Sequence, residues 1–81
     1  PDLATVLSNQ SNRLGELGRH EEALTAATRV ARVYEKLAAE HPDAFLPDLA
    51  MALSNQSGRL AELERYEEAL TAATRAAQMY E

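Results

Sequence analysis

Hydrophobic residues recur along the chain every three or four positions, which is the spacing of one face of an α-helix. At about 100° per residue, one stripe of the first stretch comprises Leu3, Val6, Leu7, Gln10, Leu14 and Leu17. The stripe of the second stretch comprises Ala23, Ala26, Ala27, Val30, Tyr34, Leu37 and Ala38. The pattern, extended to the end of the chain, predicts helices over residues 2–18, 21–40, 44–64 and 67–81. The connections are short, so consecutive helices are expected to be antiparallel.

The chain contains an internal repeat. Residues 1–35 align with residues 47–81 without a gap, and 26 of the 35 positions are identical. The sequence therefore divides into a first repeat with its connector, residues 1–46, and a second repeat, residues 47–81. The second copy stops where the first one continues, so we expect a fragment of a larger protein. A single hairpin cannot bury both of its stripes, so the two repeats are expected to stack.

Turn and cap residues predict where the helices end. Pro42 is expected to end the second helix, Asp43 to cap the third, and Pro47 to lie in its first turn. Gly18 supplies a C-terminal stop in the first copy. The second copy has Glu64 at this place, so a left-handed glycine is not expected to be obligatory there.

Small residues in the second helix of each hairpin predict a close helix–helix approach. These residues are Ala23 and Ala27 with their copies Ala69 and Ala73. None of them has bulk beyond Cβ, so each is expected to let its helix lie near the first helix of the hairpin.

Composition supports an all-α fold and narrows the classes of partner. The 81 residues include sixteen Ala and twelve Leu but no Ile and three Val, and strands favour β-branched residues. The net charge of −5 argues against a nucleic acid and against an anionic membrane. The absence of cysteine excludes a disulfide framework and a thiolate metal site. With no long apolar run and no signal peptide visible, a soluble, cytoplasmic protein is expected.

The sequence offers little for catalysis. His20 and His41 are not repeated and do not have the spacing of zinc ligands. We therefore expect His20 to be a structural residue of the hairpin turn and His41 a structural residue at a helix end. The acidic pairs Glu21-Glu22 and Glu67-Glu68 stand where a first helical turn favours carboxylates. The serines have no histidine partner and no glycine-rich phosphate loop is present. We therefore expect no enzyme activity, no metal and no cofactor.

These residues resemble the tetratricopeptide repeat family. Ser11 and Ser57 match its small first-helix residue, and Ala23 and Ala69 match its central alanine. The segments 18–23 and 64–69 resemble its Gly-x-Tyr-x-Glu-Ala turn. The His41-Pro42-Asp43 sequence is similar to the longer repeats of the kinesin-light-chain type. The repeat of this chain is longer than the family's usual ~34 residues. Its extra residues, 45–48, are expected to lie in the connection between the repeats.

The resemblance implies a right-handed solenoid of antiparallel helical hairpins, with four helices in two repeats. It also implies that the polar face of each first helix lines a concave groove for a peptide or partner helix. Asn9 and Asn55 match the family asparagine that clamps a peptide backbone, and Arg13 and Arg59 either reach an acidic ligand or pair with nearby Glu. The candidate peptide-binding residues are Asn9, Asn12, Arg13, Glu16, Asn55, Arg59 and Glu62.

Two further expectations concern the apolar stripes. Gln10 and Gln56 interrupt the stripes, and each is expected either to bond a neighbouring backbone or side-chain group or to contribute to a groove or an oligomer contact. The leading hypothesis is a non-catalytic protein–protein interaction scaffold. The alternative is a structural repeat that associates with itself, as a dimer or in end-to-end stacks, because two repeats without caps leave stripes exposed.

Overall fold

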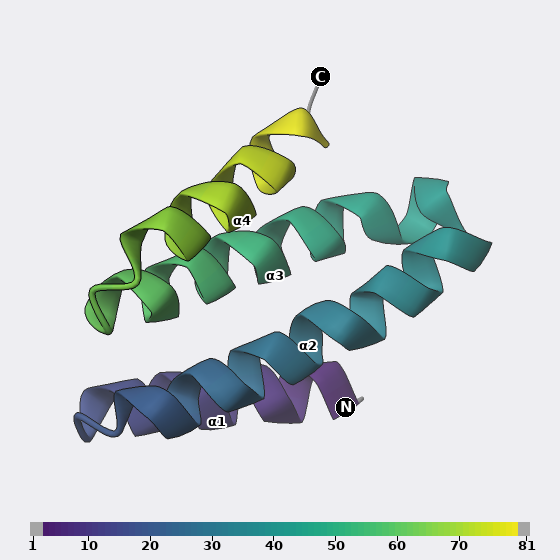
Figure 1. The fold of residues 1–81 in the computed structure, drawn as a ribbon. Coiled ribbons are helices and arrows are strands. Elements are labelled where there is room, and N and C mark those ends of the chain that lie inside the picture. Colours follow the sequence, from purple (N-terminus) through teal and green to yellow (C-terminus); the bar gives the residue numbers. More distant parts are fainter. Residues whose placement is uncertain (1–2, 80–81) are drawn as a thin grey trace.

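The computed structural model describes residues 3–79 and consists of four α-helices joined by short connections (Figure 1). The helices are α1 (Leu3–Glu16), α2 (His20–Glu40), α3 (Pro42–Glu62) and α4 (Tyr66–Gln78). The described part contains no strand, so the predicted all-α class is confirmed. Each helix runs antiparallel to the one before it (Figure 1).

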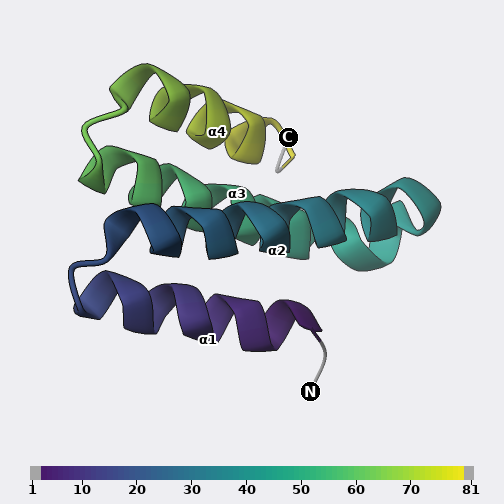
Figure 2. The ribbon, with the colours of Figure 1, turned by 60° about the horizontal axis from the view of Figure 1, so that its bottom comes forward.

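The helices form two layers. The extensive contacts lie between helices adjacent in the chain: α1 with α2, α2 with α3, and α3 with α4. The Cα atoms span 35 × 30 × 14 Å, and the smallest extent is that of two packed helices, whose axes lie ~8–10 Å apart. Arg75 Nη2 of α4 lies 3.3 Å from Glu35 Oε2 of α2, which places these two helices in one layer. The central pair α2 and α3 extends past α1 and α4 at one end (Figure 2).

The turn inside each hairpin has the same hydrogen bonds in both copies. The N–H groups of Gly18 and Arg19 donate to the carbonyls of Gly15 and Leu14, at 3.0 and 2.9 Å. This is the Schellman pattern that satisfies the last carbonyls of a helix, and it needs a residue with positive φ. Gly18 has φ 76°.

In the second copy the residue with positive φ is Glu64, which carries a side chain. Glu64 has φ 60°, and the N–H groups of Glu64 and Arg65 donate to Ala61 and Leu60. The expectation that glycine is not obligatory at this turn is therefore confirmed, although the left-handed conformation itself is kept. The hydrogen-bond pattern, and not the residue type, sets the backbone there.

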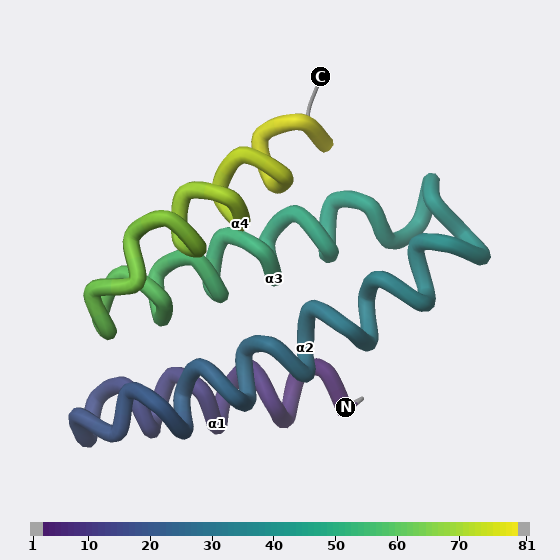
Figure 3. Tube along the Cα trace, viewed as in Figure 1, coloured from purple at the N-terminus to yellow at the C-terminus, as the bar shows by residue number. Residues whose placement is uncertain are grey.

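The connection between the repeats is shorter than predicted. A single residue, His41, ends α2 and precedes α3, and the trace reverses there without a loop (Figure 3). Its carbonyl accepts the N–H groups of Ala44 and Phe45 at 3.2 and 3.1 Å. Asp43 is thus not the N-cap: His41 is, and Pro42 occupies the first helical position, where its missing N–H is harmless.

Pro47 lies inside α3 and not in its first turn, because the helix begins at Pro42. The extra residues of this long repeat are therefore helical and not part of a loop. They carry Phe45, whose ring centroid is 6.4 Å from that of Tyr34 and 6.5 Å from that of His41. Phe45 packs against the core, and so the added turn closes the projecting tip of α2 and α3.

The predicted stripe of α1 is buried only in part. Leu7 is buried, whereas Leu3 and Val6 are 56% and 53% exposed. Their copies in α3, Leu49 and Ala52, are 5% and 3% exposed. The difference arises because α2 covers this side of α3, and no element in the described chain covers the same side of α1.

The alanine prediction fails at one position for the same reason. Ala23, Ala27 and Ala69 are buried, but Ala73 is exposed. Ala27 lines a pocket with residues of α3, so this position faces the following repeat as well as the hairpin. Every predicted stripe residue of α2 is buried or half-buried.

Candidate functional site

A line of three depressions runs between α1 and α3, the first helices of the two repeats. The outer ones are lined chiefly by these helices, and each shares residues with the central one: Asn12 on one side, Ser8 and Asn55 on the other. We call this surface the α1–α3 trough. It is defined by Ser8, Asn12, Gly15, Glu16, Tyr34, Asp48, Met51, Asn55, Arg59 and Glu62.

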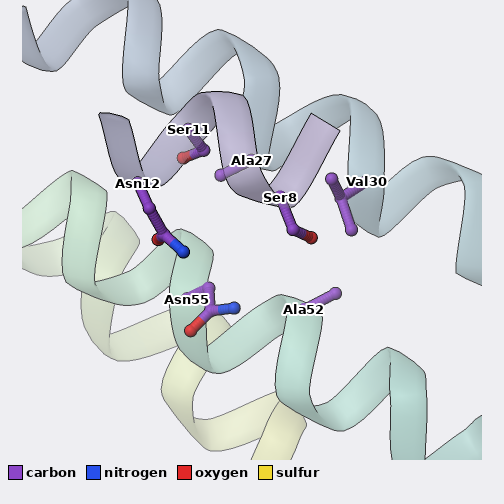
Figure 4. Close-up of a pocket in the computed structure, with 7 residues that line it drawn as sticks. All are labelled: Ser8, Ser11, Asn12, Ala27, Val30, Ala52 and Asn55. Carbon is purple, nitrogen blue, oxygen red and sulfur yellow. The ribbon is translucent and has the colours of Figure 1, made fainter. Parts of the chain in front are cut away.

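The centre of the trough is a narrow pocket (Figure 4). Ser8 and Asn12 reach it from α1 and Asn55 from α3, while Val30 of α2 and Ala52 of α3 form apolar parts of its wall. Its volume of about 10 Å³ is close to that of one water probe. The centre therefore presents two side-chain amides at a surface that is too tight for a small-molecule ligand.

One end of the trough is charged. Arg59 Nη1 lies 3.2 Å from Glu62 Oε1, and His20 Nδ1 of α2 lies 3.3 Å from the same oxygen. The Arg59 guanidinium also lies against the backbone of Gly15, where a Cβ would collide with Nη1. Glu16 lines this end from α1. The absence of a side chain at Gly15 thus lets Arg59 of the second repeat reach across to the first.

The structure brings together five of the seven predicted site residues. Asn12, Glu16, Arg59 and Glu62 line the charged depression, and Asn55 joins Asn12 in the central pocket. Of the two alternatives for Arg59, pairing with a nearby glutamate is the one found.

The other two predicted residues, Asn9 and Arg13, are exposed and do not line these three depressions. Asn9 is the copy of Asn55, which faces α1 across the trough. The corresponding side of α1 has no neighbouring first helix in the described chain.

Five residues of the trough were not among the candidates: Ser8, Gly15 and Met51, which lie on the first helices of the repeats, and Tyr34 and Asp48. Tyr34 comes from α2, and Asp48 lies early in α3, where a connection had been expected. Asp48 follows the helical period from Asn55 and Met51, so continuing the polar face of this helix toward its N-terminus would have revealed it.

The two repeated glutamines have different environments. Gln56 Nε2 donates to Thr28 Oγ1 at 3.1 Å, so its amide bonds a neighbouring side chain across the boundary between the repeats. Gln10 is exposed, and its place inside a buried stripe is not confirmed. The glutamine position therefore belongs to the contact between repeats.

Two of the serines have structural hydrogen-bond partners. Ser11 Oγ and Ser57 Oγ donate to the carbonyls of Ala23 and Ala69, each at 2.8 Å. In residues 3–79, no cluster of three or more metal-ligating side chains is found.

The acidic residues of the first helical turns also form ion pairs. Glu68 lies 2.7 Å from Arg65, and its carboxylate raises the pKa of that exposed guanidinium through a hydrogen bond and through its charge. The equivalent pair in the first copy, Arg19 with Glu22, is 2.6 Å apart. The two turns therefore hold their N-terminal carboxylates in the same way.

None of the helices between residues 3 and 79 has the length and hydrophobicity needed to cross a bilayer. Comparisons of the sequence and structure with known protein families, curated proteins and solved structures found no match. The site is therefore interpreted from its own residues.

Proposed function

We propose that this chain is a non-catalytic protein–protein interaction scaffold, built as a right-handed, tetratricopeptide-like stack of hairpins, and that its α1–α3 trough binds an extended peptide. The observation that supports this most strongly is the trough itself, since polar side chains from both repeats line one continuous surface.

The shape of the trough favours a peptide over a small molecule. Small-molecule sites enclose most of their ligand in a cavity of ~300–1,000 Å³. The central pocket has only about 10 Å³, and the depressions on either side are open. An extended chain can lie along such a surface without entering a cavity.

The side chains at the centre suit recognition of a peptide backbone. Asn12 and Asn55 each carry an amide with two donors and an acceptor. Because they reach the pocket from opposite helices (Figure 4), they can pair with the N–H and C=O groups of one strand of backbone. Such pairing requires no particular sequence in the ligand.

Charge favours a basic peptide. The trough contains Glu16, Asp48 and Glu62 but one arginine, Arg59, which Glu62 already partly neutralises. The chain as a whole carries a net charge of −5. Complementary charge increases the association rate and selects among partners.

Fluorescence anisotropy with short labelled peptides, one series lysine-rich and one glutamate-rich, tests the proposal. The wild type is expected to bind the lysine-rich series more tightly, with an affinity that falls as salt rises. Asn12→Ala with Asn55→Ala is expected to weaken binding about tenfold, since each lost hydrogen bond is worth ~0.5–1.5 kcal/mol.

Asn9→Ala is the matched control, because Asn9 is an exposed asparagine that does not line the trough. It is expected to leave the affinity unchanged. Equal affinity in the double variant and the wild type, or an equal loss in the control, would contradict the proposed site.

A further inference from the structure

The two ends of the molecule expose residues whose copies are buried between the repeats. Leu70 of α4 is 68% exposed, whereas its copy Leu24 in α2 is 8% exposed. At the other end, Leu17 is 71% exposed and its copy Leu63 is half-buried against the core. The chain therefore presents, unpaired, both halves of a contact that it forms once internally.

The internal contact shows how the two halves fit. Where α2 meets the second repeat, Leu24 packs in a cluster with Leu60, Leu63, Ala69 and Ala72. Beside this cluster Gln56 Nε2 donates to Thr28 Oγ1 at 3.1 Å. We call this contact the α2–α3 junction.

Each member of the junction recurs at an open end. The C-terminal end face of α4 carries Leu70 and Thr74, the copies of Leu24 and Thr28. At the N-terminal end the copies of the residues that receive them are Gln10 and Leu17, which are exposed, Leu14, which is half-buried, and Ala23 and Ala26, which are buried.

We propose that the C-terminal end face of one molecule binds the N-terminal end face of a second copy, in the register of the α2–α3 junction. In this register Leu70 packs against Leu14 and Leu17 of the second copy, and Gln10 of that copy donates to Thr74.

One pair of differences between the repeats fits this register. In the junction, Val30 of α2 and Ala52 of α3 line the same narrow pocket (Figure 4). Between molecules the equivalent residues are Ala76 and Val6, so the larger and smaller side chains exchange sides. The combined volume is unchanged, which is the kind of substitution that a packed contact tolerates best.

The contact joins two different faces and is therefore heterologous. Each bound copy leaves one free face of each kind, so addition can continue instead of stopping at a dimer. The end-face residues do not include the amides and carboxylates of the trough, so the inference does not depend on peptide binding.

Analytical ultracentrifugation of the full chain and of two single variants tests the proposal. The wild-type average mass is expected to rise with concentration beyond that of a dimer of 8.9 kDa chains. Leu70→Glu removes the C-terminal end face and Leu17→Glu the N-terminal one. Both side chains are exposed, so the fold is expected to survive, and the helical content of each variant checks this. Each variant alone is expected to be a monomer.

Mixing the two variants separates this arrangement from any symmetric dimer. Each retains the face that the other lacks, so the mixture is expected to form a one-to-one dimer and no larger species. Met51→Glu is the control: Met51 is 60% exposed but lies in the trough, and this variant is expected to assemble like the wild type.

The contrary results are equally clear. A wild type that stays at 8.9 kDa at every concentration, a single variant that dimerises with itself, or a mixture that stays monomeric would each overturn the proposal. Loss of peptide binding with assembly intact would count against the proposed function alone.

Discussion

The turn inside each hairpin contains one residue whose backbone conformation is unfavourable for any amino acid other than glycine. Both copies use the same pair of C-terminal hydrogen bonds, which require positive φ at Gly18 and at Glu64. A residue with a Cβ pays ~1–2 kcal/mol for this conformation, whereas glycine does not. No other atom lies near the site of a Cβ on Gly18, so the cost at this turn is local to the backbone.

Glu64→Gly is therefore expected to stabilise the protein. Relief of the left-handed strain exceeds the ~0.4–1 kcal/mol that glycine loses through its freer unfolded chain. The net gain of about 0.5–1 kcal/mol corresponds to a rise of roughly 2–8 °C in melting temperature, to be measured by circular dichroism.

Glu64→Ala separates charge from conformation, since it removes the carboxylate but keeps the strain. Glu64→Ala is expected to raise the melting temperature much less than Glu64→Gly does. Gly18→Ala is expected to lower the melting temperature. Equal effects of alanine and glycine at position 64 would show that the backbone strain is not the cause.

At the scale of the element, α3 shows two prolines with different consequences. Pro42 is the first residue of the helix, where no intrahelical N–H bond is lost. Pro47 lies in the second turn, and there its missing N–H leaves the Asp43 carbonyl without its helical donor. The helix nevertheless continues, and its neighbouring residues Phe45 and Leu46 pack against the core.

Pro47→Ala is expected to stabilise the protein by about 1 kcal/mol. An interior proline costs up to ~3 kcal/mol, and part of the gain is offset by the greater freedom of the unfolded alanine chain. Pro47 is exposed, so no packing is lost. Pro42→Ala, at the tolerated position, is expected to bring no gain. Equal melting temperatures for the wild type and Pro47→Ala would contradict this account.

At the scale of the whole molecule, the neighbours of a helix decide what each repeated residue contributes. Leu3 and Leu49 are copies in nearly identical local sequences, yet one is 56% and the other 5% exposed. The central helices α2 and α3 each have extensive contacts with two neighbouring helices, whereas α1 and α4 each have extensive contacts with one. Side chains of α2 and α3 are therefore expected to contribute more to stability than their copies in the outer helices.

Substitution of these two leucines is expected to have unequal effects. Leu49→Ala should cost ~2–5 kcal/mol, because it removes a buried side chain and leaves a cavity. Leu3→Ala should change the free energy of unfolding by less than ~0.5 kcal/mol. A chain of 81 residues has a total of only about 4–12 kcal/mol. Urea titration of both variants at low protein concentration makes the comparison, and similar losses would contradict the exposed end face.

Most of the trough could be found from sequence because helical period alone defines a polar face. Asn12 and Glu16 share such a face in α1, as do Asn55, Arg59 and Glu62 in α3. The period could not show which side of that face meets the other repeat, so it could not show that Asn9 lies outside the trough. Tyr34 belongs to α2, so the hydrophobic and polar pattern of α1 and α3 cannot predict that it lines the trough.

The sequence by itself determined the four helices, their hairpin turns and the duplication, since these depend on residue preferences and on neighbours a few positions away. Tertiary structure decided which copy of each residue is buried. Local sequence is almost the same in the two repeats, so it cannot distinguish Leu24 from Leu70. Burial depends on what packs from outside the hairpin, and only the arrangement of the helices supplies that neighbour.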